Sequence, residues 1–303
     1  MQVLYWFESI RFPALDEIML LITRFGEETI FLLVALSMLW CVDKRHSYYL
    51  LAVGFLGLIS NQVLKLSCRI PRPWVLDPQF TIVEKARAAA TGYSFPSGHT
   101  QTAVGTFGSI AATTRNRAVR IACIVIALLV PVSRMYLGVH TPMDVTVASA
   151  MALALILLLH PVAGEKNDCL MPWLLGGMAL CAAGFVAFVE LFPFPADIDP
   201  HNLQSGISSA YKFFGAIAGF IIVYIVDEKW LKFSVKAVWW AQILKVALGL
   251  IPVLAVKAGL KAPLNALLGE NIGAGVRYGL IVLVAGILWP MTFKWFGRLG
   301  HKE

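Results

Sequence analysis

Residues 118–160 read AVRIACIVIALLVPVSRMYLGVHTPMDVTVASAMALALILLLH. Two long apolar runs, 118–137 and 143–160, are separated by a short segment that carries an arginine, a histidine and an aspartate at its borders. Each run approaches the roughly 20 residues that an α-helix needs to cross the hydrocarbon core of a bilayer. The stretch therefore predicts two membrane-spanning helices, with polar side chains gathered at one membrane edge.

The composition of the whole chain agrees with this prediction. Of its 303 residues, 58% are apolar and 14% are charged, whereas a soluble domain has about 25% charged residues. This difference argues against a soluble enzyme. The 18 Phe, 9 Trp and 8 Tyr residues also exclude a disordered chain. We therefore expect an all-α, polytopic helical membrane protein.

Nine segments are apolar and long enough to be considered as spans: 26–42, 47–66, 98–114, 118–137, 143–160, 170–190, 205–227, 237–257 and 273–294. Residues 1–24 mix charges with aromatic residues and leucines, which favours one interfacial amphipathic helix. The segment 67–97 contains four prolines and cannot form a single helix. A long loop beside polar helix ends is a candidate functional feature.

The net charge of +7 is best explained by basic residues that flank membrane spans, and we expect no nucleic-acid partner. Basic residues are most concentrated in tight connections, such as Lys44-Arg45 and the segment 115–120. Such loops usually face the cytoplasm. With nine spans, the N-terminus and the segments 67–97 and 133–143 would face outward, and the C-terminus would be cytoplasmic.

Three segments at this outer edge carry unusual chemistry. Lys65, Arg72 and Arg134 are cations without a matching set of acids nearby in the sequence, which suits a phosphate ligand. Ser97-Gly98-His99 begins an apolar run, so its backbone N–H groups would form an anion site at a helix N-terminus. Taken alone, Pro96-Ser97-Gly98 is better explained as a turn and a helix cap.

The third segment favours a catalytic interpretation. Thr141, Pro142 and Asp144 fit the N-cap, first and third positions of a helix, which accounts for them structurally. This pattern does not explain His140. A carboxylate four residues later could hold one imidazole nitrogen and leave the other free as a nucleophile. Two histidines, three cations and an orienting aspartate together favour phosphate chemistry.

These segments resemble the signature of the type 2 phosphatidic acid phosphatase (PAP2) superfamily, K-x6-R-P, P-S-G-H and S-R-x5-H-x3-D. Lys65-x6-Arg72-Pro73, Pro96-Ser97-Gly98-His99 and Ser133-Arg134-x5-His140-x3-Asp144 match it at every position. The resemblance covers roughly residues 47–160. The same constellation occurs in vanadium haloperoxidases and in glucose-6-phosphatase, whose nine-span layout resembles the one expected here.

The resemblance implies a role for each matching residue. His140 would be the nucleophile that forms a phosphohistidine, oriented by Asp144, and His99 would protonate the leaving oxygen. The phosphate oxygens would be held by Lys65, Arg72, Ser97, Gly98 and Arg134. No metal or other cofactor is implied. The expected organisation is an interfacial helix (1–24), a PAP2-type helical bundle (25–164) and about four additional transmembrane helices of unknown role (165–303).

The resemblance leaves several functions open. We favour a membrane phosphatase that hydrolyses a lipid phosphate or diphosphate, such as undecaprenyl diphosphate or phosphatidate. Haloperoxidase chemistry is the least favoured function, because those relatives are soluble and this chain is so apolar. A lipid phosphotransferase, a phosphatase of a soluble sugar phosphate and a lipid transporter remain alternatives. The expected location is the plasma membrane with an outward-facing site, and the oligomeric state is open. Among other polar residues, Lys245 is expected to be structural and Lys212 to snorkel. His201, Asp197 and Asp199 are expected to be solvated, and their place on the outer face could put them at the border of a substrate entrance.

Overall fold

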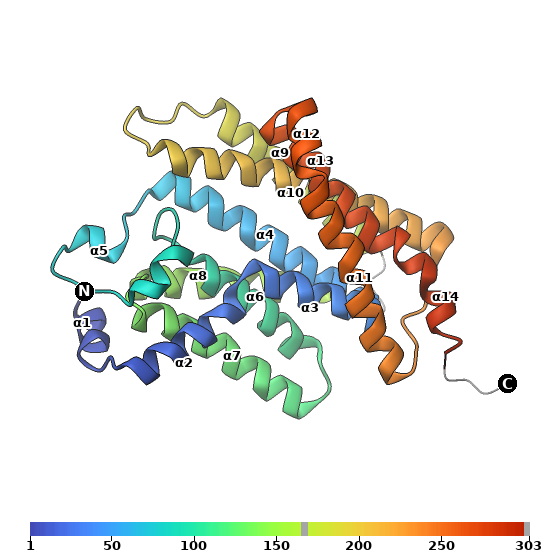
Figure 1. Ribbon diagram of the computed structural model, residues 1–303, viewed down its shortest axis with the longest axis horizontal. Coiled ribbons are helices and arrows are strands. Elements are labelled where there is room, and N and C mark those ends of the chain that lie inside the picture. Colours follow the sequence, from blue (N-terminus) through green and yellow to red (C-terminus); the bar gives the residue numbers. More distant parts are fainter. Residues whose placement is uncertain (165–168, 300–303) are drawn as a thin grey trace. The chain divides into compact units, whose positions relative to one another are not determined.

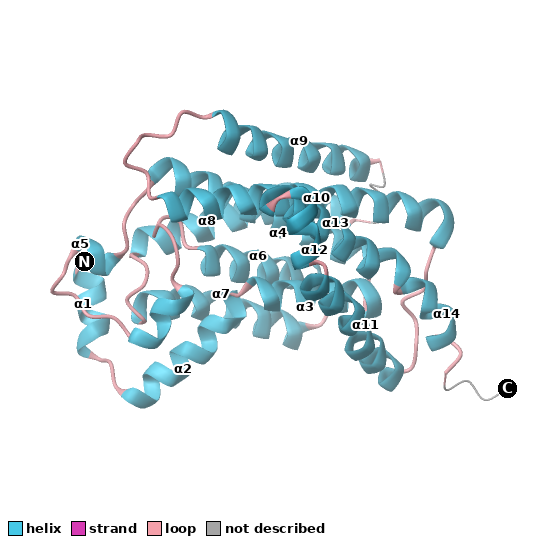
Figure 2. Cartoon of the chain, turned by 45° about the horizontal axis from the view of Figure 1, so that its top comes forward, coloured by secondary structure: helices cyan, strands magenta, loops and turns pink. Residues whose placement is uncertain are grey.

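The computed structural model describes residues 1–164 and 169–299, and these residues form helices and loops without any strand (Figures 1 and 2). The protein is an all-α, polytopic membrane protein, as expected. Seven helices in the described part are long and apolar enough to span a membrane. They begin at Lys44, Arg117, Pro142, Leu170, Pro200, Trp239 and Glu270.

The other two of the nine expected spans form shorter helices. α3 (Glu28–Cys41) has 14 residues and α6 (Gly98–Thr113) has 16. At 1.5 Å per residue, α6 is about 24 Å long, which is less than the roughly 30 Å of a hydrocarbon core. Ser97 caps its start, and the chain leaves helical geometry at Thr114. The nine-span layout is therefore corrected, within the described residues, to seven helices long and apolar enough to span a membrane, a shorter apolar helix, α3, and the short, less apolar α6.

The chain divides into two compact units. The first contains residues 1–34, 49–167 and 195–203, and the second contains 35–48, 168–194 and 204–303. The expected division at 164/165 falls at the first of the undescribed residues, 165–168. Residues 35–48 precede this division but belong to the second unit, and residues 195–203 follow it but belong to the first unit.

The N-terminal stretch, expected as one helix, contains two: α1 (Gln2–Ser9) and α2 (Pro13–Thr23). Pro13 stands at the start of α2, where its missing N–H costs nothing. Phe7 of α1 is buried against Tyr136, and the Tyr136 hydroxyl donates to Asp16 of α2 at 2.7 Å. The two helices are thus packed on the C-terminal end of α7 (Arg117–Tyr136).

In the first unit, α6 packs against α7 (Arg117–Tyr136) and α8 (Pro142–Leu159). α4 (Lys44–Cys68) leads into the segment 67–97, which holds only α5 (Pro73–Leu76) and the 3-10 helix Glu84–Ala89. Gly26, in the 3-10 turn Arg24–Gly26, touches the start of α6, since an added Cβ would lie 2.6 Å from the carbonyl oxygen of His99. The 3-10 turn His160–Ala163 follows α8 in this unit.

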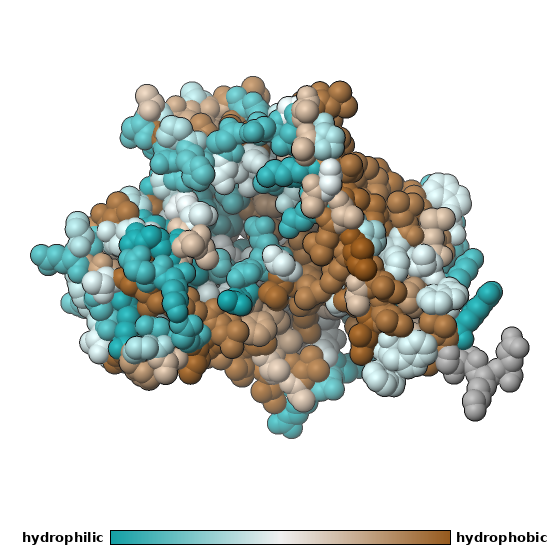
Figure 3. Space-filling view, in the orientation of Figure 1, coloured by the Kyte–Doolittle hydropathy of each residue, from teal (hydrophilic) through white to brown (hydrophobic). Residues whose placement is uncertain are grey.

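The second unit contains α9 (Leu170–Leu191), most of α10 (Pro200–Val226), the π-helical turn Asp227–Leu231, α11 (Trp239–Gly259), α12 (Lys261–Leu268), α13 (Glu270–Leu283), a second π-helical turn (Val284–Leu288), the 3-10 turn Pro290–Thr292 and α14 (Phe293–Phe296). Exposed Ile243, Ile251 and Leu254 make the outer face of α11 apolar, as Figure 3 shows for this side of the unit. Such a face suits contact with lipid.

Lys245 has the structural role expected from the sequence. It is fully buried, and its ammonium donates to the carbonyl oxygens of Trp40 at 2.8 Å and Val235 at 2.9 Å. Its Nζ also lies 4.6 Å from the centre of the Phe293 ring. The buried charge therefore joins the end of α3 to α11 and to the loop that precedes it, with its donors used inside the second unit.

Candidate active site

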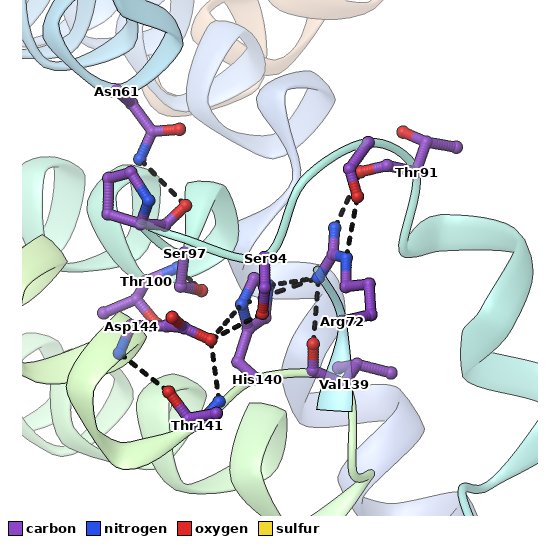
Figure 4. A network of polar contacts seen from close by, with 12 residues as sticks. Asn61, Arg72, Thr91, Ser94, Ser97, Thr100, Val139, His140, Thr141 and Asp144 are labelled. Atoms are coloured by element: carbon purple, nitrogen blue, oxygen red, sulfur yellow. Dashed lines mark hydrogen bonds and ion pairs between the residues drawn. The ribbon is translucent and has the colours of Figure 1, made fainter. Parts of the chain in front are cut away.

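All eight candidate site residues come from helix ends of the first unit. Lys65 lies in the last turn of α4, Arg72 at the N-cap of α5 and Arg134 in the last turn of α7. Ser97 caps α6, and Gly98 and His99 are its first two residues. His140 lies between α7 and α8, and Asp144 is in the first turn of α8. Figure 4 shows the contacts that join several of these elements.

His140 and Asp144 form the pair that the sequence predicts. Both are 1% exposed, and His140 Nδ1 lies 3.4 Å from Asp144 Oδ2. The same oxygen accepts the backbone N–H of Thr141 at 2.8 Å, which completes a capping box with the Thr141 side chain. Asp144 therefore takes part in the cap at the start of α8 and also holds the His140 side chain.

The hydroxyl of Ser94 is a further donor to this carboxylate. Ser94 is fully buried, and its Oγ donates to Asp144 Oδ2 at 2.6 Å (Figure 4). Its own backbone N–H donates to the carbonyl of Ile70 at 2.8 Å. A carboxylate that accepts two close hydrogen bonds is fixed in position, so Ser94 helps to set the direction of the Asp144–His140 contact.

Arg72 determines the tautomer of His140. Its Nη1 lies 2.8 Å from His140 Nε2 and 3.5 Å from Nδ1. Because a guanidinium can only donate, Nε2 must accept, and the ring proton of a neutral imidazole is then on Nδ1 facing Asp144. The lone pair of Nε2 is the one that a nucleophilic histidine would use.

The position of Arg72 is fixed by the backbone of the segment 67–97. Its Nε donates to the carbonyl of Gly92 at 3.0 Å, its Nη2 to Thr91 at 2.6 Å and its Nη1 to Val139 at 2.9 Å. These contacts hold a guanidinium that is 5% exposed directly beside the imidazole. The long loop predicted as a functional feature is thus the scaffold of this arginine.

The neighbouring cations also affect the protonation state of His140. Burial lowers the pKa of His140 well below its ordinary value, and the positive charges of Arg72, Arg134 and Lys65 lower it further. Each of these groups disfavours an imidazolium. His140 is therefore neutral at neutral pH, which is the form that carries a nucleophilic nitrogen.

Arg134 and His99 have buried nitrogen atoms that form no hydrogen bond in the described part of the chain. Arg134 is fully buried, and its Nη1 donates to Thr23 Oγ1 at 2.9 Å, while its Nε and Nη2 have no partner in the described part of the chain. Nε2 of His99 is also buried without a partner there. Buried polar groups in proteins are nearly always paired. These orphaned atoms fit an anion with several acceptor oxygens.

The start of α6 offers backbone donors to the same anion. The Ser97 side chain accepts from the N–H of Thr100, and helix geometry leaves the N–H groups of Gly98 and His99 without acceptors of their own. An added Cβ at Gly98 would meet only Asn61 Oδ1, at 3.8 Å. The protein itself therefore does not require glycine here, whereas a ligand that approaches the backbone would.

The sequence interpretation missed Ser94, Thr23 and the carbonyl groups of Thr91 and Gly92 that hold Arg72. Nothing in the motif spacing points to Ser94 or Thr23, because their partners lie 50 and 111 residues away. Asp197 and Asp199, expected to be solvated, are exposed and also contact other residues of this unit. Asp197 lies 3.4 Å from Arg69, and the N–H of Asp199 donates to the Tyr93 hydroxyl at 3.4 Å.

Residues 1–164 and 169–299 contain no group of three or more His, Cys, Asp or Glu side chains placed to hold a metal ion. The charge at the candidate site is supplied by Lys65, Arg72 and Arg134. These three cations can neutralise a phosphate through hydrogen bonds and Coulomb attraction.

Comparison with known proteins agrees with the geometry. Residues 45–168 match the PAP2 superfamily, and residues 211–302 match the transmembrane extension of PAP2 superfamily phosphatases. The chain carries a PAP2 superfamily domain followed by a PAP2 transmembrane extension. The first match contains all eight candidate site residues, and the second covers most of the helices that the sequence left without a role.

Two curated relatives are undecaprenyl-diphosphatases. The chain is 33% identical over 134 residues to undecaprenyl-diphosphatase BcrC of Bacillus subtilis, and 29% identical over 134 residues to an undecaprenyl-diphosphatase of Sulfolobus acidocaldarius. Each match covers 44% of this chain, and 66% and 63% of the relative's own length. No solved structure is a significant match to the chain.

Proposed function

We propose that the protein is a membrane phosphatase that removes a phosphate group from a lipid diphosphate, with undecaprenyl diphosphate as the leading candidate substrate. The main support is one arrangement: a neutral, buried His140 beside three cations and the unpartnered donors of Arg134 and His99. The names of the two relatives support the choice of lipid.

In the proposed reaction, the phosphate is bound by Lys65, Arg72, Arg134, Ser97 and the N–H of Gly98. His140 Nε2 attacks phosphorus and forms an N–P bond, while the bond to the leaving oxygen breaks and His99 protonates that oxygen. Asp144 accepts the Nδ1 proton in a hydrogen bond and stabilises the positive imidazole ring. Water activated by His99 then hydrolyses the phosphohistidine and releases phosphate.

Arg72 has two tasks in this scheme. In the structure its Nη1–H group is directed at the Nε2 lone pair of His140 at 2.8 Å. Attack requires that lone pair, so this N–H must turn to a phosphate oxygen when substrate binds. Substrate binding would thereby free the Nε2 lone pair of His140 for attack. The remaining Arg72 bonds to Thr91 and Gly92 would keep the guanidinium in place.

We further propose that the site faces outward across the plasma membrane. The support is the placement of basic residues in the tight connections at Lys44-Arg45 and at 115–120, each one helix away from the site residues. A cysteine introduced in the segment 77–90 of a protein without its native cysteines should be labelled by an impermeant thiol reagent in intact cells. A cysteine at position 116 should not be labelled, and the reverse pattern would place the site in the cytoplasm.

The activity itself is tested with purified protein in detergent. Undecaprenyl diphosphate, phosphatidate and sugar phosphates are offered separately, and released inorganic phosphate is measured for the wild type and for His140→Ala. We expect release from the lipid diphosphate by the wild type alone. Transfer of the phosphate to a second lipid without release would instead show a phosphotransferase, and release from sugar phosphates alone would replace the lipid substrate.

A further inference from the structure

The guanidinium of Arg134 is held by the protein at one corner. The group is fully buried, and its Nη1 donates to Thr23 Oγ1 at 2.9 Å, whereas its Nε and Nη2 form no hydrogen bond in the described part of the chain. Nε and Nη2 lie side by side on one edge of the planar group, and such an edge can bind two oxygens of a phosphate at once. The bond to Thr23 therefore leaves a bidentate edge available for an anion.

Arg72 does not offer such an edge. Its Nε donates to the carbonyl of Gly92 at 3.0 Å and its Nη2 to that of Thr91 at 2.6 Å, so the backbone uses both donors. Its Nη1 is the atom that faces the histidine, 2.8 Å from His140 Nε2. Of the two arginines in the candidate site, Arg134 is therefore the one whose geometry suits bidentate binding of a phosphate.

The position of Thr23 is fixed by the packing of α2 on α7. Thr23 is the last residue of α2 and is 5% exposed. Asp16, seven residues earlier, accepts the Tyr136 hydroxyl of α7 at 2.7 Å. Seven residues are about two turns of an α-helix, so Asp16 and Thr23 lie on the same face of α2. That face is attached to α7 at two points, and one of them is the guanidinium of Arg134.

The 3-10 turn Arg24–Gly26, directly after Thr23, packs on the start of α6. An added Cβ at Gly26 would lie 2.6 Å from the carbonyl oxygen of His99 and 2.8 Å from its Cβ, so glycine allows this close approach. Residues 23–26 thus contact two helices of the candidate site. They lie before the segment that matches the PAP2 superfamily, residues 45–168.

A hydroxyl is a suitable partner for an arginine that binds an anion. Thr23 Oγ1 accepts a hydrogen bond from Nη1 and adds no negative charge, so Arg134 keeps the positive charge that attracts a phosphate. A carboxylate at the same place would pair with the guanidinium and repel the phosphate. A valine would have nearly the same shape but could not accept the hydrogen bond.

We propose that Thr23 is a positioning residue of the candidate active site, which holds Arg134 so that its Nε and Nη2 bind two oxygens of the substrate phosphate. The inference rests on the proposed phosphatase function and extends it to a residue outside the signature motifs. The N-terminal helices α1 and α2, expected from the sequence as one interfacial helix, then contribute to phosphate binding.

The experiment compares Thr23→Val, Thr23→Ser and Tyr136→Phe in the full chain, purified in detergent. Thr23→Val removes the acceptor and Thr23→Ser keeps it. Tyr136→Phe is the matched control, because it removes another bond between α2 and α7 without touching Arg134. Phosphate release from undecaprenyl diphosphate gives kcat and KM. Isothermal titration with orthovanadate measures the Kd of an anion without turnover, and the unfolding temperature of each protein is recorded.

We expect Thr23→Val to lower kcat/KM about ten-fold and to raise the Kd of orthovanadate by a similar factor, because a hydrogen bond to a charged group is lost. Thr23→Ser should stay within about two-fold of the wild type, and Tyr136→Phe should lose thermal stability without a comparable change in Kd. Wild-type kcat/KM and Kd in Thr23→Val would overturn the proposal. Equal losses in Thr23→Val and Tyr136→Phe would also overturn it, because they would show that Thr23 only attaches α2.

A double variant shows whether Thr23 acts through Arg134. Arg134→Lys lacks the bidentate edge, so Thr23→Val should change the Kd of orthovanadate much less in this background than in the wild type. An equal factor in both backgrounds would contradict the proposal. If Thr23→Val does not fold, Thr23→Ala takes its place, since it puts no methyl group against the guanidinium.

The two readouts separate this inference from the proposed function. A wild type that binds orthovanadate but releases no phosphate from the lipid diphosphate would refute the proposed function, and the Kd values of the variants would still decide the role of Thr23. A wild type that does not bind orthovanadate would overturn the inference as well.

Discussion

Ser94→Ala tests whether the Asp144–His140 pair depends on a residue outside the signature motifs. The Ser94 hydroxyl donates to Asp144 Oδ2 at 2.6 Å, and both residues are buried. A hydrogen bond to a charged group contributes about 1.5–3 kcal/mol. The backbone N–H of Thr141 still donates to the same oxygen, so the carboxylate would remain held but less firmly.

If half or more of that energy is realised in the transition state, kcat falls about 4-fold to 160-fold, since 1.4 kcal/mol corresponds to a factor of ten. KM should change little, because Ser94 is not expected to touch the substrate. Steady-state phosphate release over a range of lipid concentrations separates the two constants. Ser149→Ala, which removes a hydroxyl that bonds only to the carbonyl of Val145 within α8, is the control.

The reasoning would be refuted if Ser94→Ala were folded and kept the kcat of the wild type, or if it raised KM alone. Either result would mean that the orientation of Asp144 comes from the capping box without Ser94. A parallel loss of kcat and of thermal stability in Ser149→Ala would show that any buried hydroxyl in this unit has the same effect.

Three other predictions concern the same site. EDTA should leave the activity unchanged, because three cations supply the charge that a metal would supply, and vanadate should inhibit as an analogue of the phosphoryl-transfer transition state; loss of activity on chelation with recovery on adding magnesium would contradict the first part. Gly98→Ala should fold normally, since the new Cβ meets only Asn61 Oδ1 at 3.8 Å, yet should raise KM or lower kcat about ten-fold by obstructing the phosphate; wild-type kinetics would show that the start of α6 is only a helix cap. NMR of protein labelled with 15N-histidine should show His140 neutral and protonated on Nδ1 at pH 6.5, because a lowered pKa keeps the imidazole neutral as the pH falls through its ordinary value; an imidazolium signal at that pH would contradict the burial argument.

The sequence predicts the fold class well because the length and hydropathy of an apolar segment can be read from that segment without knowing what it packs against. All nine apolar segments are helical, and the capping box at Thr141 and Asp144 is present as its pattern indicates. The lengths of α3 and α6 are less predictable. α3 begins only after the extended residue Glu27, and α6 runs from the Ser97 cap to the extended residue Thr114. Hydropathy does not report such local changes of the backbone.

The candidate site also combines features that the sequence predicts with features that only the structure shows. The motif spacing predicts Arg72 as a cation near His140, and the structure places it there, but its role toward the Nε2 lone pair follows only from the 2.8 Å contact. Ser94 and Thr23 lie in segments with no recognisable pattern, and they reach the site through the path of the loop 67–97 and the packing of α2. The sequence also does not show that Arg277, within the expected span 273–294, is buried.

The most direct test of the proposed mechanism is the capture of the intermediate. Purified protein is mixed with undecaprenyl diphosphate labelled in its terminal phosphate, quenched within milliseconds in alkali, digested and analysed for phosphohistidine, which is stable to base and labile to acid. We predict that label is found on His140 of the wild type, that it accumulates in a His99 variant whose second step is slow, and that it is absent from His140→Ala. Label on another residue, or phosphate release by His140→Ala at the rate of the wild type, would contradict the account.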